Sequence, residues 1–228
     1  MDTRSRLDEL LREHGLYVRG VTRLTNDEIE AYELDADQAQ LVLVGNVGSS
    51  YWSQFSLSSE FGDGETNPLD RWSRRIATSI AEELSLRPLY PFEGPPYFPF
   101  QQWAKRTEGL EQSPIGVMIH PQIGLWHSYR FALLGADLGC QTATDLGASP
   151  CISCVDKSCL HTCPVDAFDA SGYAVDRCAT YLQETPGAEC HQQGCLARYA
   201  CPVAPELRYI AAQGRFHLGA FLSSRPGT

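Results

Sequence analysis

Eight cysteines gathered in one stretch constrain this chain more than any other feature. The chain has 228 residues and 9 cysteines, and all but one of these lie between residues 151 and 202, where two runs end in Cys-Pro. They are Cys151, Cys154, Cys159, Cys163, Cys178, Cys190, Cys195 and Cys201. Thiolates are soft ligands that suit zinc and iron–sulfur clusters. Inside a cell, clustered cysteines are more often metal ligands than disulfides. The stretch therefore indicates a metal-binding module.

The spacing of these cysteines favours iron–sulfur clusters. A bacterial ferredoxin half-motif reads C-x2-C-x2-C-x3-C-P, and its fourth cysteine binds the other of two clusters. Residues 151–164 have this form with the central gap widened to four residues. We therefore expect two [4Fe–4S] clusters, each with four thiolate ligands. The first set is Cys151, Cys154, Cys159 and Cys201, and the second is Cys163, Cys178, Cys190 and Cys195.

Some points about this module stay open at the level of sequence. A zinc site, or one cluster with spare thiols, is an alternative to two clusters. Five residues separate Cys195 from Cys201 where the motif has three, so the sharing of the later cysteines between the clusters is also open. The ninth cysteine, Cys140, lies outside the motif, and we expect it to be a small buried residue.

Composition excludes several classes of function. The formal net charge is −10, whereas a nucleic-acid partner requires a basic surface. No run approaches the roughly 18 apolar residues of a membrane span, and the first residues lack the apolar segment of a secretory signal. We therefore expect a cytoplasmic protein with neither nucleic acid nor membrane as a partner.

Periodicity predicts a layered domain ahead of the cysteines. Apolar residues at helical spacing, short apolar runs and turn residues alternate over the first 140 positions, which favours an α+β class. The helix that begins at Asn67-Pro68 is the clearest, with asparagine as N-cap and an end at Pro88. The other expected elements are helices at 4–14, 50–60 and 206–213, and strands at 17–24, 41–44, 115–119 and 126–134.

Two loops carry further possibilities. Gly45 to Ser50 leads from an apolar strand into a helix, where Ser49 or Ser50 is expected as N-cap, although backbone amides there can also bind a phosphate. Residues 90–103 are dense in proline and aromatic side chains. That loop either lines a flat apolar pocket or packs rigidly on the core.

Two stretches resemble known families. The cysteine module, about 148–205, resembles the double-cluster ferredoxin domain of epoxyqueuosine reductases and corrinoid reductive dehalogenases, including Asp176-Arg-Cys178-Ala-Thr-Tyr181-Leu between the cysteine groups. Gly116-Val-Met-Ile119-His120-Pro121-Gln-Ile-Gly124-Leu-Trp126 resembles the Gly-Val-x-Ile-His-Pro-x-x-Gly-x-Trp signature of CblC, the intracellular cobalamin-processing protein. Weaker likeness to CblC extends over residues 1–138.

This resemblance implies a fold and an activity. The fold is a flavin-reductase (nitroreductase-like) α+β core with a C-terminal ferredoxin domain. It divides the chain into a CblC-like cobalamin-binding domain at 1–142, a double-cluster domain at 143–205, and a C-terminal helix and tail at 206–228. The implied activity is that of an oxidoreductase, which reduces cobalamin and removes its upper axial ligand by reductive decyanation. Electrons would come from an external reductase or flavoprotein through the clusters, which replace the glutathione-binding region of CblC.

The resemblance also suggests roles for individual residues. His120 would be catalytic, near the upper ligand of cobalt. Pro121 and Gly124 would shape the turn beside the corrin, and Trp126 would pack on the ring or support His120. The implied cofactor-binding set is Ile119, His120, Pro121, Gly124, Trp126, Phe98, Phe100, Trp103 and Tyr129, with Tyr129 as a proton donor or hydrogen-bond partner.

Three alternatives differ in class. The chain can use cobalamin to reduce an organic substrate, as dehalogenases do. It can be a non-catalytic cobalamin chaperone or an electron-transfer protein. It can also keep FMN in the core pocket in place of cobalamin.

Overall fold

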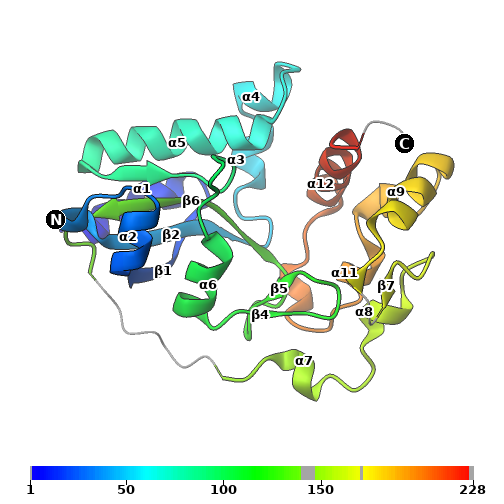
Figure 1. Cartoon of the computed structure of the whole chain (residues 1–228). Coiled ribbons are helices and arrows are strands. Elements are labelled where there is room, and N and C mark those ends of the chain that lie inside the picture. Colours follow the sequence, from blue (N-terminus) through cyan, green and yellow to red (C-terminus); the bar gives the residue numbers. More distant parts are fainter. Residues whose placement is uncertain (1, 140–146, 170–171, 226–228) are drawn as a thin grey trace. The chain divides into compact units, whose positions relative to one another are not determined.

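The computed structural model describes residues 2–139, 147–169 and 172–225 (Figure 1). Cys140 lies outside the described residues. The chain divides into two compact units, and each is described by itself. Unit 1 comprises residues 1–109 and 127–146, and unit 2 comprises residues 110–126 and 147–228.

One segment, residues 110–126, belongs to a different part of the structure from the one that the sequence predicted. Residues 110–126, which contain the His120 motif, pack with the cysteine-bearing part of the chain in unit 2. The sequence placed them in a first domain ending at residue 142. The domain boundaries stay a prediction, but the motif and the cysteines are neighbours within one unit.

Unit 1 is built on an antiparallel sheet in the order β1-β2-β6-β3. One of its two central strands, β2, carries Leu41 to Val44, which are completely buried. Its elements are α1 (Thr3–Glu13), β1 (Tyr17–Arg23), α2 (Asn26–Ala31), η1 (Ala36–Gln38), β2 (Gln40–Val47), α3 (Trp52–Ser56), α4 (Ser59–Gly62), α5 (Pro68–Leu84), β3 (Arg87–Leu89), α6 (Phe100–Glu108) and β6 (His127–Gly135). The α+β class expected from the sequence is confirmed.

Helices cover the sheet through apolar faces set by the sequence. In α5, Trp72, Ile76 and Ile80 repeat at helical spacing, and all are buried. Figure 1 shows α5 running along the sheet, where it packs against β6 and β3, whereas α1 packs against β1 and α5. Helix α6 packs against β1, and this helix positions several of the residues considered below.

Three details of helix ends differ from the sequence prediction. Asn67 precedes α5 as expected, but its φ of 51° is left-handed and its side chain makes no capping hydrogen bond. The helix ends at Leu84, its C-cap Ser85 also has a left-handed backbone, and Pro88 lies in β3. Earlier in the chain, the prediction that Ser49 or Ser50 caps the helix after Gly45 was wrong. The N-cap of α3 is Tyr51, and the Ser50 hydroxyl donates to the Gly15 carbonyl at 2.6 Å.

Unit 2 consists of short helices and hairpins around the cysteines. Its elements are β4 (Glu111–Gln112), β5 (Met118–Ile119), α7 (Pro150–Ser153), α8 (Ser158–His161), β7 (Phe168–Asp169), β8 (Gly172–Tyr173), α9 (Val175–Glu184), α10 (Cys190–Gln193), α11 (Leu196–Tyr199), η2 (Pro205–Leu207) and α12 (Ala211–Ser223). The last helix is longer and later than the expected one at 206–213. It packs closely on α10, where a Cβ at Gly214 would lie 1.9 Å from the Gln193 carbonyl oxygen.

One apolar cluster joins the His120 motif to the cysteine-bearing loops. Ile119, Leu125 and Trp126 from the motif share this core with Cys201 and Tyr209. Half-buried cysteines, among them Cys151, Cys159, Cys163 and Cys195, pack against it. The core of unit 2 is therefore built directly beneath the residues that were expected to bind metal.

Candidate functional site

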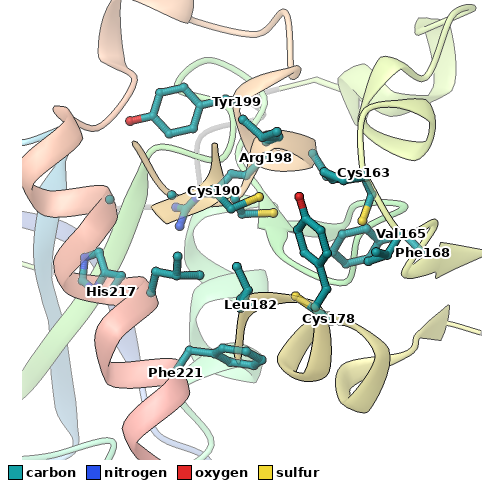
Figure 2. Close-up of a pocket in the computed structure, with 18 of the residues that line it drawn as sticks. Cys163, Val165, Phe168, Cys178, Leu182, Cys190, Arg198, Tyr199, His217 and Phe221 are labelled. Carbon is teal, nitrogen blue, oxygen red and sulfur yellow. The ribbon is translucent and has the colours of Figure 1, made fainter. Parts of the chain in front are cut away.

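Four of the cysteines surround a cavity of about 200 Å³ in unit 2. They are Cys163, Cys178, Cys190 and Cys195. Figure 2 shows the sulfur atoms of the first three around this space, with Phe168, Leu182 and Phe221 among the apolar walls. The structure thus brings together, around one apolar cavity, the four cysteines that the sequence assigned to the second set.

Burial makes the thiols of Cys178, Cys190 and Cys195 weakly acidic. It raises the pKa of Cys195 to about 11. It also raises the pKa values of Cys178 and Cys190, although a hydrogen bond from the Tyr173 hydroxyl opposes the rise at Cys178. Bare thiols with such pKa values are protonated at neutral pH. A metal centre that binds here must therefore release protons.

The other four cysteines line a second, narrower cavity. They are Cys151, Cys154, Cys159 and Cys201. Its volume is about 20 Å³, which is room for about one water molecule. An open groove of about 640 Å³ adjoins it and shares Ser113, Cys151 and Lys157 with its lining. A cluster bound by these four cysteines would need more room than this cavity provides, so their side chains would have to move apart.

The His120 motif forms part of the wall of this second cavity. Ile119 and Leu125, on either side of the turn, line it with the cysteines. Gly124 has a φ of +62°, and a Cβ on it would lie 2.7 Å from the Val203 carbonyl oxygen. The Trp126 indole donates to the same carbonyl at 3.0 Å. Glycine and tryptophan in the motif are therefore explained by close packing on the chain that follows Cys201.

Arg198 ties the motif to the last cysteine pair. It lies between Cys195 and Cys201 in sequence and donates to the Leu125 carbonyl. Its guanidinium lies 5.5 Å from the ring centre of Trp126 and 4.4 Å from that of Tyr209. Sequence reasoning missed this residue, and its place inside the cysteine run is the only signal that pointed to it.

The turn at His120 holds its imidazole in one tautomer. His120 is buried, and its backbone exchanges two hydrogen bonds with Gly124, at 2.9 and 3.0 Å. Its Nδ1 accepts from the amides of Gln122 at 3.0 Å and Ile123 at 3.3 Å. Because Nδ1 is an acceptor, the proton of the neutral ring is on Nε2. Pro121 lies within the turn closed by these bonds.

The aromatic residues expected in a pocket wall gather in unit 1. Trp103 on α6 is completely buried, and its indole donates to Glu28 at 2.8 Å. Phe98 and Phe100 lie against it, with ring centres at 6.1 and 5.2 Å. The proline-rich loop therefore packs on its own helix. A role for these rings in binding a cofactor stays a prediction.

Unit 1 also contains a buried ionic network that the sequence did not indicate. Arg19 donates to the Glu108 carboxylate at 3.0 and 3.3 Å and to the Asn46 carbonyl at 2.8 Å. The Tyr129 hydroxyl donates to the same carboxylate, and Ser128 donates to the Asn46 side chain at 2.5 Å. Tyr129, expected as a proton donor or hydrogen-bond partner, therefore has its hydroxyl proton directed at Glu108.

Burial dominates the electrostatics of this network. It raises the pKa of Glu108, while the charge of Arg19 and the hydroxyl of Tyr129 act in the opposite direction. Burial also raises the pKa of Tyr129, and the neighbouring carboxylate adds to the rise. Tyr129 is therefore neutral throughout the physiological pH range.

Among the residues that the structure describes, no three histidine, cysteine, aspartate or glutamate side chains are arranged to hold a single metal ion. No helix in that part of the chain is long and apolar enough to cross a membrane.

Comparison with solved structures identifies a fold. The chain is similar to the C. elegans B12-trafficking protein CblC, a human MMACHC homologue, with a TM-score of 0.52 and 15% identity over 93% of this chain and 89% of that chain. Epoxyqueuosine reductase from Bacillus subtilis gives a TM-score of 0.49 and 13% identity, over 90% of this chain and 66% of that chain. No protein-family profile and no curated protein matches the sequence. The first likeness shows that this chain has a CblC-like α+β fold.

Proposed function

We propose that this chain is a cobalamin-binding iron–sulfur oxidoreductase that reduces cobalamin and removes its upper axial ligand, such as cyanide. One observation supports this most. Ile119 and Leu125, which flank the His120 turn, line the same cavity as four cysteines. A metal cluster at that cavity would lie within one packed unit with His120, so the clusters and the proposed catalytic turn share a core.

The chemistry of the cysteines fits two four-iron clusters. Each cavity is bordered by four thiols and otherwise by mostly apolar side chains. A single zinc ion holds its sulfur ligands about 2.3 Å from the metal, and therefore close to one another. A four-iron cluster places each thiolate on a different iron, so its ligands stand farther apart.

A backbone amide near one cysteine also supports this proposal. The Ala167 amide donates to Cys163 Sγ at 3.3 Å. Hydrogen bonds to the sulfurs are one of the features that tune the potential of iron–sulfur clusters. When bound, the clusters would carry single electrons from an external reductase or flavoprotein, and the corrin would supply the ligand chemistry.

In this proposal His120 donates a hydrogen bond from a fixed position. The amides of Gln122 and Ile123 hold Nδ1 as an acceptor, so Nε2 carries the hydrogen and can donate a hydrogen bond to the departing ligand as negative charge develops on it. Ile119, Pro121, Gly124 and Trp126 hold the turn in place. Phe98, Phe100, Trp103 and Tyr129 stay predicted cofactor-binding residues.

Visible spectroscopy with cyanocobalamin tests the proposal directly. We expect the reconstituted protein to shift the spectrum toward the base-off form. Dithionite, or a flavoprotein donor, should then give cob(II)alamin and free cyanide at a rate above that of free cyanocobalamin. Binding without loss of cyanide would instead favour a chaperone. Tight FMN binding with no corrin binding would contradict the proposal, and turnover of an organohalide would point to the dehalogenase alternative.

His120→Asn is expected to lower the rate of decyanation by about ten- to a hundredfold, because the departing anion loses a hydrogen bond worth about 1.5–3 kcal/mol. Asparagine keeps an oxygen that can accept the two amide hydrogen bonds of the turn, but its side chain is too short to place a donor where Nε2 lies. Binding of cyanocobalamin should therefore be retained. The rate is measured from the appearance of cob(II)alamin under anaerobic conditions.

The matched control is His161→Ala, because His161 also lies among the cysteines but is exposed. It should leave the rate unchanged. An unchanged rate in His120→Asn would show that His120 has no part in ligand removal.

A further inference from the structure

Two buried serine hydroxyls near the second cavity have no hydrogen-bond partner among the described residues. Ser113 lies in the segment that carries the His120 motif, and Ser149 precedes α7. Each side chain belongs to a residue that is only 6% exposed. Both line the open groove beside Cys151, and Ser113 also lines the narrow cavity with the four cysteines.

Leaving such hydroxyls unpaired is costly. A buried polar group without a partner costs roughly 1–3 kcal/mol, so native proteins rarely keep one without a reason. The backbone around the two serines is already satisfied in other ways. The Ser113 amide and carbonyl take part in the turn that ends at Val117, and the Ser149 carbonyl accepts from Ile152 at 3.0 Å. Ser149 occupies an N-cap position, yet its side chain makes no capping bond.

The surroundings point to sulfur as the missing acceptor. Ser149 precedes Cys151 by two residues, and both serines line the open groove with Cys151. Ser113 also lines the narrow cavity with the four cysteines, so a cluster held there would bring sulfur atoms to these hydroxyls. Lys157, whose ammonium donates to the Cys151 carbonyl at 3.3 Å, adds a positive charge to the same wall.

We propose that Ser113 and Ser149 donate hydrogen bonds to sulfur atoms of the cluster held by Cys151, Cys154, Cys159 and Cys201, and thereby raise the midpoint potential of that cluster. This inference rests on the proposed function, since it requires a cluster at this cavity. Hydrogen bonds to cluster sulfurs stabilise the reduced form, which carries one more negative charge.

Redox titration of the full reconstituted chain, followed by EPR, tests this. We expect Ser113→Ala and Ser149→Ala each to lower the midpoint potential of one cluster, the same one in both variants. The double variant should lower it by about the sum. The cluster affected is identified as the one that is absent in Cys159→Ala. Its resonance Raman bands should shift in D2O in the parent protein and should shift less in the double variant.

Two further variants control for structural effects. Ser113→Thr keeps the hydroxyl, so the midpoint potential of the cluster should stay at the parent value. Ser153→Ala removes a serine hydroxyl beside Cys154 that is exposed and donates to the Pro150 carbonyl at 3.3 Å, so it should leave the potential unchanged. A potential that is unchanged in the double variant, or lowered equally in both clusters, would overturn the inference.

The same preparation separates this inference from the proposed function. A protein that binds no iron, or binds zinc instead, would contradict the proposed function itself. A protein that binds about eight irons per chain but shows no shift in the serine variants would contradict only the role of the serines.

Discussion

Replacing Cys159 with alanine is expected to lower the iron content of the reconstituted protein from about eight atoms per chain to about four, and to abolish reductive turnover of cobalamin. Cys159 lines the narrow cavity together with Ile119 and Leu125 of the His120 motif. Loss of this cluster would remove the carrier that shares a core with His120. Iron analysis, EPR and the rate of cob(II)alamin formation measure the effect.

Two other cysteines make this experiment specific. Cys178→Ala removes a ligand from the larger cavity and should also halve the iron content, but the EPR signal that remains should be that of the other cluster. Cys140→Ser changes a cysteine outside the motif and should keep about eight irons and full turnover. If Cys159→Ala retained turnover with the same donor, the clusters would not supply the electrons.

The order of cysteines along the chain carried more information than any other sequence feature. The exchange of the fourth ligand between two clusters divided the eight into two sets, and the structure places each set around its own cavity. No sequence pattern comparable to the cysteine spacing identified the other residues that line those cavities. Phe221 borders the larger one from α12, 26 residues beyond Cys195 and in a helix whose start the sequence placed too early.

Local patterns predicted much of unit 1. The helical spacing of Trp72, Ile76 and Ile80 identified α5, and the apolar run at Leu41 identified β2. Helix ends were predicted less well. A left-handed Asn67 and a left-handed Ser85 depend on how the chain enters and leaves the sheet, and no short-range preference specifies this.

Contacts between residues far apart in the chain could not be predicted from the sequence. The contacts between the His120 motif and Val203 join residues separated by 77 positions, through a backbone carbonyl that any residue would provide. The unpaired hydroxyls of Ser113 and Ser149 are likewise visible only once their surroundings are known. Arg19 and Glu108 are ordinary charged residues in sequence and become distinctive only through burial.

Arg19→Met is expected to destabilise unit 1 by about 3–5 kcal/mol at neutral pH, because it leaves the Glu108 carboxylate buried without its charge partner. The two side chains are only 4% and 8% exposed, so water cannot replace the lost contact. Urea unfolding of the full chain, followed by tryptophan fluorescence, measures this. Arg23→Met, in the same strand but exposed, is the matched control and should change stability by less than about 0.5 kcal/mol.

The pH dependence of this loss distinguishes an unpaired charge from lost packing. Burial raises the pKa of Glu108, and Arg19 opposes the rise, so the pKa is higher still in Arg19→Met. A carboxyl whose pKa is raised on folding binds more protons in the folded state, and stability then increases as the pH falls toward its ordinary value. The destabilisation should therefore shrink between pH 7 and pH about 4.5. The double variant Arg19→Met/Glu108→Gln should recover much of the loss at pH 7, and a cycle showing no coupling between the two positions would contradict this account.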